Sequence, residues 1–174
     1  MPATTHDGAP TPPSSTPPAT SVVVVQPDEG ATLHAFGGAM RILLGGAETG
    51  GTLVVALETT PPGGGPPPHR HRDEDELVLV IEGREEFLAD GRWTAVGPGG
   101  AVYLPRGTTH TFRNVGDAPS RHWVLVTPSG FERFFAGCAE AFAAPGGPDM
   151  ERVAALIAAH GIEIDAPPGA PPAA

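Results

Sequence analysis

Glycine and proline interrupt this chain so often that a fold built on long helices is excluded. The 174 residues include 24 Gly and 22 Pro, and no window of 30 residues is free of both. Because glycine weakens the interior of a helix and proline breaks it, coiled coils and long helical bundles cannot form. The runs between these residues are short and rich in β-branched side chains, which predicts strands.

The expected strands follow one another at the spacing typical of an all-β sandwich or barrel. We assign strands to Val22–Val25, Met40–Leu44, Thr52–Leu57, Leu77–Ile81, Glu86–Ala89, Val102–Leu104, His110–Val115 and Trp123–Val126. The dipeptide Asp90-Gly91 follows one of these strands and indicates a tight hairpin. Since helical segments do not alternate with the strands, the pattern argues against a βαβ fold.

After Pro128 the spacing of the apolar residues becomes helical. One face of the first expected helix carries Phe131, Phe134, Phe135, Cys138 and Phe142. Ser129 and Glu132 fit a capping box at its start. A second helix is expected to begin at Pro148-Asp149 and to end at Gly161. We expect both helices to cover an open end or face of the β domain.

Composition divides the chain into four parts. Residues 1–21 are rich in Pro and Thr and are expected to be a disordered tail. Residues 22–128 are expected to form the β-barrel domain, and residues 129–165 its helical extension. Residues 166–174, which are rich in Pro and Ala, are expected to be flexible.

The balance of charge limits the possible partners. Twenty Asp and Glu against ten Arg give a formal charge of −10, so no basic stripe is available for nucleic acid. No run of 18 apolar residues is present, which predicts no membrane span. The first twenty residues lack the basic and apolar parts of a signal peptide, and Cys138 is the single cysteine. We therefore expect a cytoplasmic protein with a small-molecule partner.

One segment concentrates residues that bind metals. In a strand, His69 and His71 point to the same face, whereas Glu76 needs a turn or bulge to reach them. Imidazoles and a carboxylate suit a first-row divalent ion, and His110 is a candidate further ligand. An H-x-H pair alone is also common on protein surfaces, so a surface role stays open at this point. The acidic run Asp73–Asp75 is interpreted as a solvated loop.

Two longer patterns contain these residues. Residues 63–83 read G-x5-H-x-H-x4-E-x6-G, and residues 99–114 read G-x5-P-x-G-x2-H-x3-N. Both are similar to the two signature motifs of the cupin superfamily. The resemblance implies a double-stranded β-helix, a jelly-roll barrel, here with two C-terminal α-helices. It also implies one divalent transition metal (Fe, Mn, Ni, Co, Cu or Zn), with His69, His71, Glu76 and His110 as its ligands.

The remaining motif residues are expected to shape the backbone. Gly83, Gly99 and Gly107 permit turn or bulge conformations that are closed to other residues. Pro105 is expected to rigidify the approach to the second motif's histidine. Asn114 is expected to form hydrogen bonds in a turn and not to bind the metal.

A small cupin with three histidines, one glutamate and a C-terminal helical extension resembles the quercetinase-type dioxygenases. This resemblance implies that a substrate hydroxylate binds the metal, that dioxygen is the second substrate, and that Glu76 is both ligand and general base. Strand parity places Val78 and Val80 on the same face as Glu76, and Phe112 on the same face as His110, as the substrate pocket.

Other activities occur within the same superfamily. A lyase, isomerase or cyclase would use the ion as a Lewis acid only. A third alternative is a protein that binds a metal or small ligand without catalysis. The resemblance also implies a homodimer, with the apolar strand Val22–Val25 covering a sheet edge.

Overall fold

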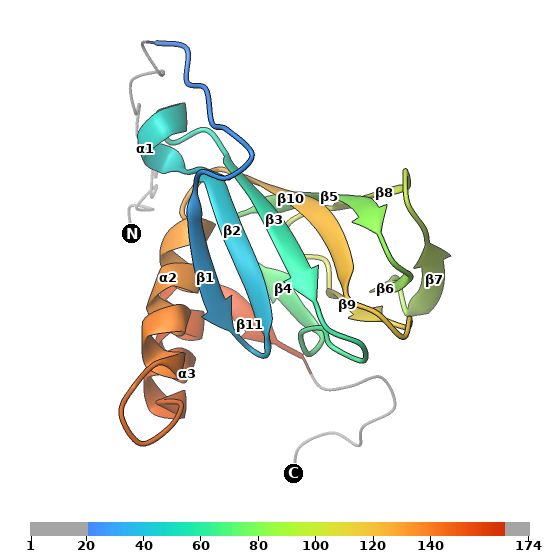
Figure 1. The fold of residues 1–174 in the computed structure, drawn as a ribbon. Coiled ribbons are helices and arrows are strands. Elements are labelled where there is room, and N and C mark those ends of the chain that lie inside the picture. The colour runs from blue at the N-terminus through green and yellow to red at the C-terminus, as the bar shows by residue number, and fades with distance from the viewer. Residues whose placement is uncertain (1–20, 166–174) are drawn as a thin grey trace, which may run out of the picture.

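Two antiparallel sheets face each other in the β domain of the computed structural model, which describes residues 21–165 (Figure 1). The tails predicted over residues 1–21 and 166–174 lie outside the described residues, apart from Ser21. The first sheet has the order β1 (Ala31–Ala35), β2 (Gly38–Leu44), β3 (Val54–Thr60), β10 (Ser120–Thr127), β5 (Asp75–Glu82), β8 (Ala101–Leu104). The second has the order β11 (Ile162–Ile164), β4 (His69–His71), β9 (His110–Asn114), β6 (Glu85–Ala89), β7 (Arg92–Val96).

The core lies between the two sheets. Along the central strands of the first sheet, the buried positions alternate with more exposed ones, as the period of a pleated strand requires. The buried side chains include Val54, Ala56, Val78, Val80, Val124 and Val126 from the first sheet and Phe87 from the second. The interior is therefore mostly aliphatic, and any polar side chain in it is conspicuous.

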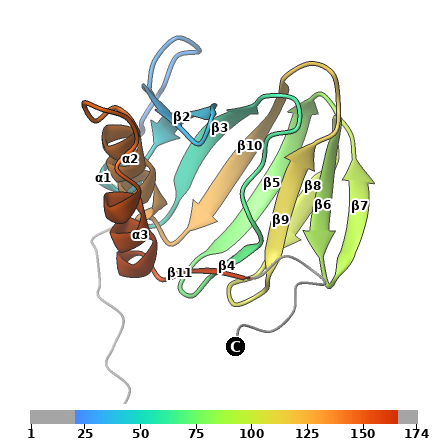
Figure 2. The same ribbon diagram turned by 90° about the horizontal axis from the view of Figure 1, so that it is seen from below.

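Two helices close one side of the β domain, as the sequence predicts. Helix α2 (Phe131–Phe142) packs against β1 and against α3 (Met150–Ala159), which leads directly into β11 (Figure 2). A single turn of helix, α1 (Gly46–Thr49), precedes β3 and was not predicted. Within residues 21–165, neither these helices nor any other combines the length and the apolar character needed to cross a membrane.

The two helix starts differ in how well the sequence predicted them. Asp149 caps α3 and accepts a hydrogen bond from the Arg152 amide at 3.0 Å, which agrees with the predicted start. The predicted cap of α2 is wrong, because its N-cap is Gly130 and Ser129 makes no capping bond. Instead, Glu132 Oε2 accepts from the Gly130 amide at 2.7 Å, and its Oε1 accepts from the Gly46 amide at 3.1 Å. One carboxylate thereby serves the starts of both α2 and α1.

The predicted strand Val22–Val25 is wrong. These residues form no strand, and the side chains of Val22 and Val24 are 91% and 69% exposed. The edge of the first sheet is instead the short hairpin of β1 and β2, whose ends are close in sequence and pair throughout. Because β propensity acts only where a partner strand is available, the valine run stays unpaired.

Glycines with positive φ angles shape the loops around β4. Gly83, Gly99 and Gly107 all have positive φ, as predicted. The Gly107 amide donates to the His71 carbonyl at 2.7 Å, so this turn is bonded to β4. Gly65 has a φ of +149°, and a Cβ built on it would lie 2.1 Å from the Phe112 carbonyl oxygen. Only glycine lets the loop before β4 lie this close to β9.

Candidate metal centre

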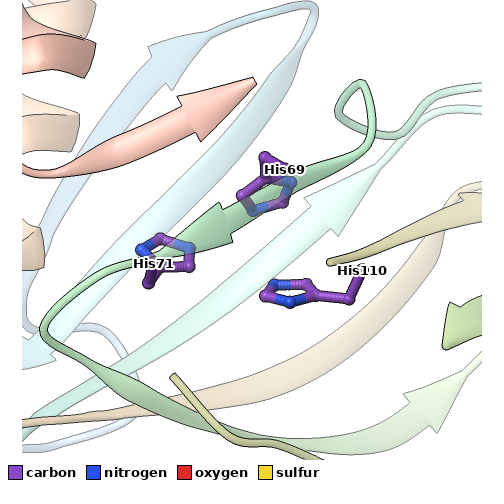
Figure 3. A group of neighbouring side chains, drawn as sticks. All are labelled: His69, His71 and His110. Atoms are coloured by element: carbon purple, nitrogen blue, oxygen red, sulfur yellow. The ribbon is translucent and has the colours of Figure 1, made fainter. Parts of the chain in front are cut away.

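Strand β4 places two histidines beside a third on the neighbouring strand. The Pro-rich stretch before it favours extended backbone, which leads the chain into a strand at His69. His69 pairs in register with His110 on β9, while β11 pairs with the other edge of β4. Figure 3 shows the rings of His69 and His71 from β4 and of His110 from β9 turned toward one another.

The three imidazoles are close enough to share one ion. One nitrogen from each of His69, His71 and His110 lies within 4.8 Å of the others. The ring centroids are 4.6 Å apart for His69 and His110, and 5.0 Å apart for His69 and His71. The geometry thus brings together all three histidines that the sequence selected.

Backbone carbonyls fix the tautomers of two of these rings. Nδ1 of His69 lies 3.0 Å from the Pro67 carbonyl oxygen, and Nδ1 of His110 lies 2.8 Å from that of Thr108. Because a carbonyl can only accept, both Nδ1 atoms carry the proton, and in the neutral form of each ring Nε2 is the atom with the lone pair. The buried Nε2 of His110 and both ring nitrogens of His71 have no hydrogen-bond partner. Since buried nitrogens seldom lack a partner, these residues fit a divalent cation.

Glu76 approaches the histidines from the opposite sheet. The chain bends after β4 and enters β5, so the parity of a single strand does not apply, and the turn expected from the sequence is present. Oε2 of Glu76 lies 3.2 Å from His110 Nε2, and Oε1 lies 3.5 Å from His71 Nε2. Glu76 is not within the group of atoms that all lie within 4.8 Å of one another. Its carboxylate therefore borders two of the three imidazoles.

The protonation states suit metal binding. Burial, then the charges of its neighbours, lowers the pKa of His69 to about 4, and burial also lowers the pKa of His71. Burial would raise the pKa of Glu76, but the adjacent His110 and His71 outweigh it and hold this pKa at about 2. Burial alone would lower the pKa of His110. Its contact with Glu76 outweighs burial, so the pKa of His110 is raised. A carboxylate and neutral imidazoles thus coexist at neutral pH in His69, His71 and Glu76.

The acidic run before β5 is only partly a solvated loop. Asp73 is exposed and paired with Arg72, which agrees with that interpretation. Asp75 accepts from the backbone and side chain of Arg106 at 2.8 to 3.0 Å. The buried Oε2 of Glu74 has no hydrogen-bond partner and lies 3.8 Å from Nδ1 of His71. Glu74 therefore faces the metal-binding strand, which its position in a charged run did not suggest.

The histidines open into a cavity of about 220 Å³ between the two sheets. Val78 and Phe112 line it, as predicted, whereas Val80 is buried in the core and does not line it. Much of the wall comes from the C-terminal extension, through Phe131, Phe134, Phe135, Ile157, Ile162 and Ile164. The sequence predicted that the helices would cover the β domain and favoured core packing for Phe131 and Phe134, whereas these side chains and β11 contribute to the cavity wall.

A second polar group at the same cavity consists of Glu58 and Glu85, which the sequence analysis missed, and His122, for which it favoured a surface or core role over contact with the pocket. His122 on β10 and Glu58 on β3 both line the cavity, and Nδ1 of His122 lies 2.9 Å from Glu85 Oε1 on β6. Burial lowers the pKa of His122, but its contacts with Glu58 and Glu85 outweigh burial and raise it to about 9. Each of these charged residues occupies an inward position of its strand, and that parity is the signal that could have revealed them.

Comparison with known proteins supports the fold. Residues 56–127 match the cupin domain family. The structure of KdgF from Halomonas sp. is 20% identical, with a TM-score of 0.57, and the match covers 64% of this chain and 99% of that one. A predicted oxalate decarboxylase from Thermotoga maritima is 21% identical, with a TM-score of 0.55, over 61% of this chain and 99% of that one. No curated protein matches this chain. The fold is the expected double-stranded β-helix, with two C-terminal helices added to it.

Proposed function

We propose that the protein is a metal-dependent dioxygenase that acts on a small aromatic or enolic molecule, and the match of residues 56–127 to the cupin domain family supports this proposal. One observation carries this proposal: three imidazoles and a carboxylate meet at one end of an otherwise largely apolar cavity. We assign the metal to His69, His71 and His110, with Glu76 as a fourth ligand.

The charge of this group favours an anionic oxygen. Three neutral imidazoles and one carboxylate leave a divalent ion with a net charge of about +1. When bound, such an ion supplies Lewis acidity at the substrate oxygen and, if it is redox-active, electron exchange with dioxygen. The protein's part is to hold the ring nitrogens of His69 and His110 in fixed tautomers, which the Pro67 and Thr108 carbonyls do.

Glu76 is our candidate for the general base. Its carboxylate is ionised at neutral pH and is 7% exposed within the cavity wall. Neither of its contacts with His71 and His110 has hydrogen-bond geometry, so its oxygens keep free acceptor capacity. A substrate hydroxyl placed beside the histidines can therefore transfer its proton to Glu76.

The apolar wall suits a flat ring. Phe112 from β9 and Phe131 and Phe134 from α2 line the cavity together with Val78. Aromatic walls bury a ring with favourable edge and face contacts and keep bulk water from the reacting atoms. This lining favours an aromatic or enolic substrate over a strongly polar one such as a sugar.

Metal replacement and dioxygen uptake test the proposal. The apoprotein is loaded in turn with Fe(II), Mn(II), Co(II), Ni(II), Cu(II) and Zn(II), and dioxygen consumption is followed with flavonols and related enols. We expect uptake with at least one redox-active ion and none with Zn(II). Absence of uptake with every ion, together with turnover under nitrogen, would instead establish a lyase, isomerase or cyclase. Ligand-induced changes in the metal spectrum without any turnover would establish a binding protein.

We further propose that the protein is a homodimer. The exposed apolar side chains of Val22–Val24 support this proposal, because a second copy would remove them from water. Light scattering should give twice the monomer mass of 17.7 kDa, and a monomer at micromolar concentration would contradict it.

A further inference from the structure

The cavity has a second polar region, formed by Glu58, His122 and Glu85. His122 pairs with Glu58 in the register of β10 and β3, and its Nε2 lies 3.3 Å from Glu58 Oε2. Its Nδ1 lies 2.9 Å from Oε1 of Glu85, which reaches across from the other sheet. The imidazole is thus held between two carboxylates that come from facing sheets.

This region is remote from the histidines that face Glu76. Val126 pairs with Glu76, and His122 precedes Val126 by four residues on β10. At about 3.3 Å per residue, the backbone position of His122 lies about 13 Å along β10 from the position that pairs with Glu76. The intervening inward positions carry Val124 and Val78, and both of these side chains line the cavity.

Glu58 is the most exposed member of this second region. The side chains of His122 and Glu85 are 1% and 0% exposed, whereas that of Glu58 is 21% exposed and lines the cavity. Oε1 of Glu58 accepts only a long hydrogen bond from Thr60, at 3.4 Å. Glu58 therefore presents an incompletely satisfied acceptor to the cavity, and a carboxylate has room for several donors.

We propose that Glu58 is a second binding site in this cavity, which accepts a hydrogen bond from a hydroxyl or amino group at the end of the substrate remote from the metal. His122 and Glu85 are positioning residues that hold the Glu58 carboxylate in place. This inference rests on the proposed function, and it narrows the substrate class. The ligand carries an enolic oxygen at one end, a hydrogen-bond donor at the other, and an apolar middle that packs against Phe112 and Val78.

A matched pair of probes tests this inference by binding, without turnover. Flavonol has a single, enolic hydroxyl, and its analogue carries one additional phenolic hydroxyl at the far end of the phenyl ring. Dissociation constants for both are measured with the Zn(II)-loaded protein by calorimetry. Because the added donor meets a carboxyl oxygen with free acceptor capacity, we expect the analogue to bind about tenfold more tightly than flavonol.

Variants of Glu58 separate recognition from structure. The preference is the ratio of the dissociation constant of flavonol to that of the analogue. In Glu58→Met this ratio should fall to about one, while the affinity for flavonol and the zinc content stay within about twofold of the wild-type values. Glu58→Gln retains the size and polarity of the side chain and should lose at least half of the preference. Glu82→Gln, on the exposed end of β5, is the control and should keep it fully. A structural defect would weaken both probes alike and leave their ratio unchanged.

The outcomes distinguish this inference from the proposed function. Equal affinity of the wild-type protein for both probes, or an unchanged preference in the Glu58 variants, overturns the inference alone. If neither probe binds while zinc is fully loaded, the inference and the proposed aromatic or enolic substrate are both wrong.

Discussion

His122 and Glu58 stand opposite each other on adjacent strands, and Glu85 contacts His122 from the facing sheet. Within residues 21–165, His122 is the only buried histidine outside the candidate metal centre, and its ring lies between these two carboxylates. Isolated charges in an apolar interior are costly, whereas a charge that is paired on both sides is retained. The pair therefore has a consequence for stability that is separate from any role in ligand binding.

Stability should fall as the pH rises through the pKa of His122. This pKa is raised from 6.5 to about 9 in the folded protein. A raised pKa gives a stabilisation that is complete below about pH 6.5 and is lost as the pH rises through about 9, with a magnitude on the order of 3 kcal/mol. Denaturant unfolding at about pH 6 and about pH 10 measures it. In His122→Gln this pH dependence should shrink, and an equal dependence in both proteins would contradict the assignment.

Replacing a histidine of the metal centre should remove the metal. His110→Ala deletes one ring nitrogen of the cluster, and the affinity for a divalent ion should fall by about a hundredfold or more, since even outer partners of metal ligands are worth 10 to 100-fold. Elemental analysis after dialysis against a weak chelator gives the stoichiometry. His34→Ala, on the exposed face of β1, should bind metal as the wild type does. Full metal content in His110→Ala would refute the site.

Glu76→Gln should separate metal binding from turnover. The amide can still coordinate weakly but cannot accept a proton, so we expect most of the metal to stay bound while turnover falls by about 100-fold or more. Dioxygen uptake and metal content are measured on the same samples. Glu82→Gln, which changes an exposed carboxylate on the same strand, provides the control. Wild-type turnover in Glu76→Gln would remove Glu76 from the mechanism.

Gly65→Ala should destabilise the loop before β4. Its φ of +149° and the Phe112 carbonyl oxygen, 2.1 Å from the new Cβ, both oppose the methyl group. We expect a loss of about 2–4 kcal/mol in the free energy of unfolding. Gly63→Ala is a matched control, because Gly63 also has a positive φ but an open space around its Cβ, and it should cost only about 1–2 kcal/mol. Equal losses would show that the contact with β9 is unimportant.

The sequence predicted those parts of the structure that depend on local pattern. Short apolar runs predicted most of the strands. The spacing of the two motifs selected His69, His71 and His110, which the fold brings together. The start of α3 at Asp149 was also predicted, because a capping side chain acts within one turn of its own helix.

Features that depend on distant contacts could not be predicted in this way. Strand β11 has only three residues, and its pairing with β4 depends on where α3 ends. Glu132 was correctly singled out near the start of α2, but one of its two hydrogen bonds goes to Gly46, far away in the sequence. The role of Glu58 likewise arises only when β3 lies beside β10 and the facing sheet supplies Glu85.

The C-terminal strand β11 pairs with β4 on the side away from β9, and backbone hydrogen bonds flank this pairing at both ends. The Arg72 amide donates to the Gly161 carbonyl at 3.0 Å, and the Asp165 amide donates to that of Pro68 at 2.8 Å. The segment that matches the cupin domain contains every proposed ligand and the β4 side of this pairing, but not β11. Residues 129–165 thus supply part of the cavity wall but none of the proposed ligands, so substitutions in this stretch can alter the space for a small molecule while the donor atoms of the ion stay in place.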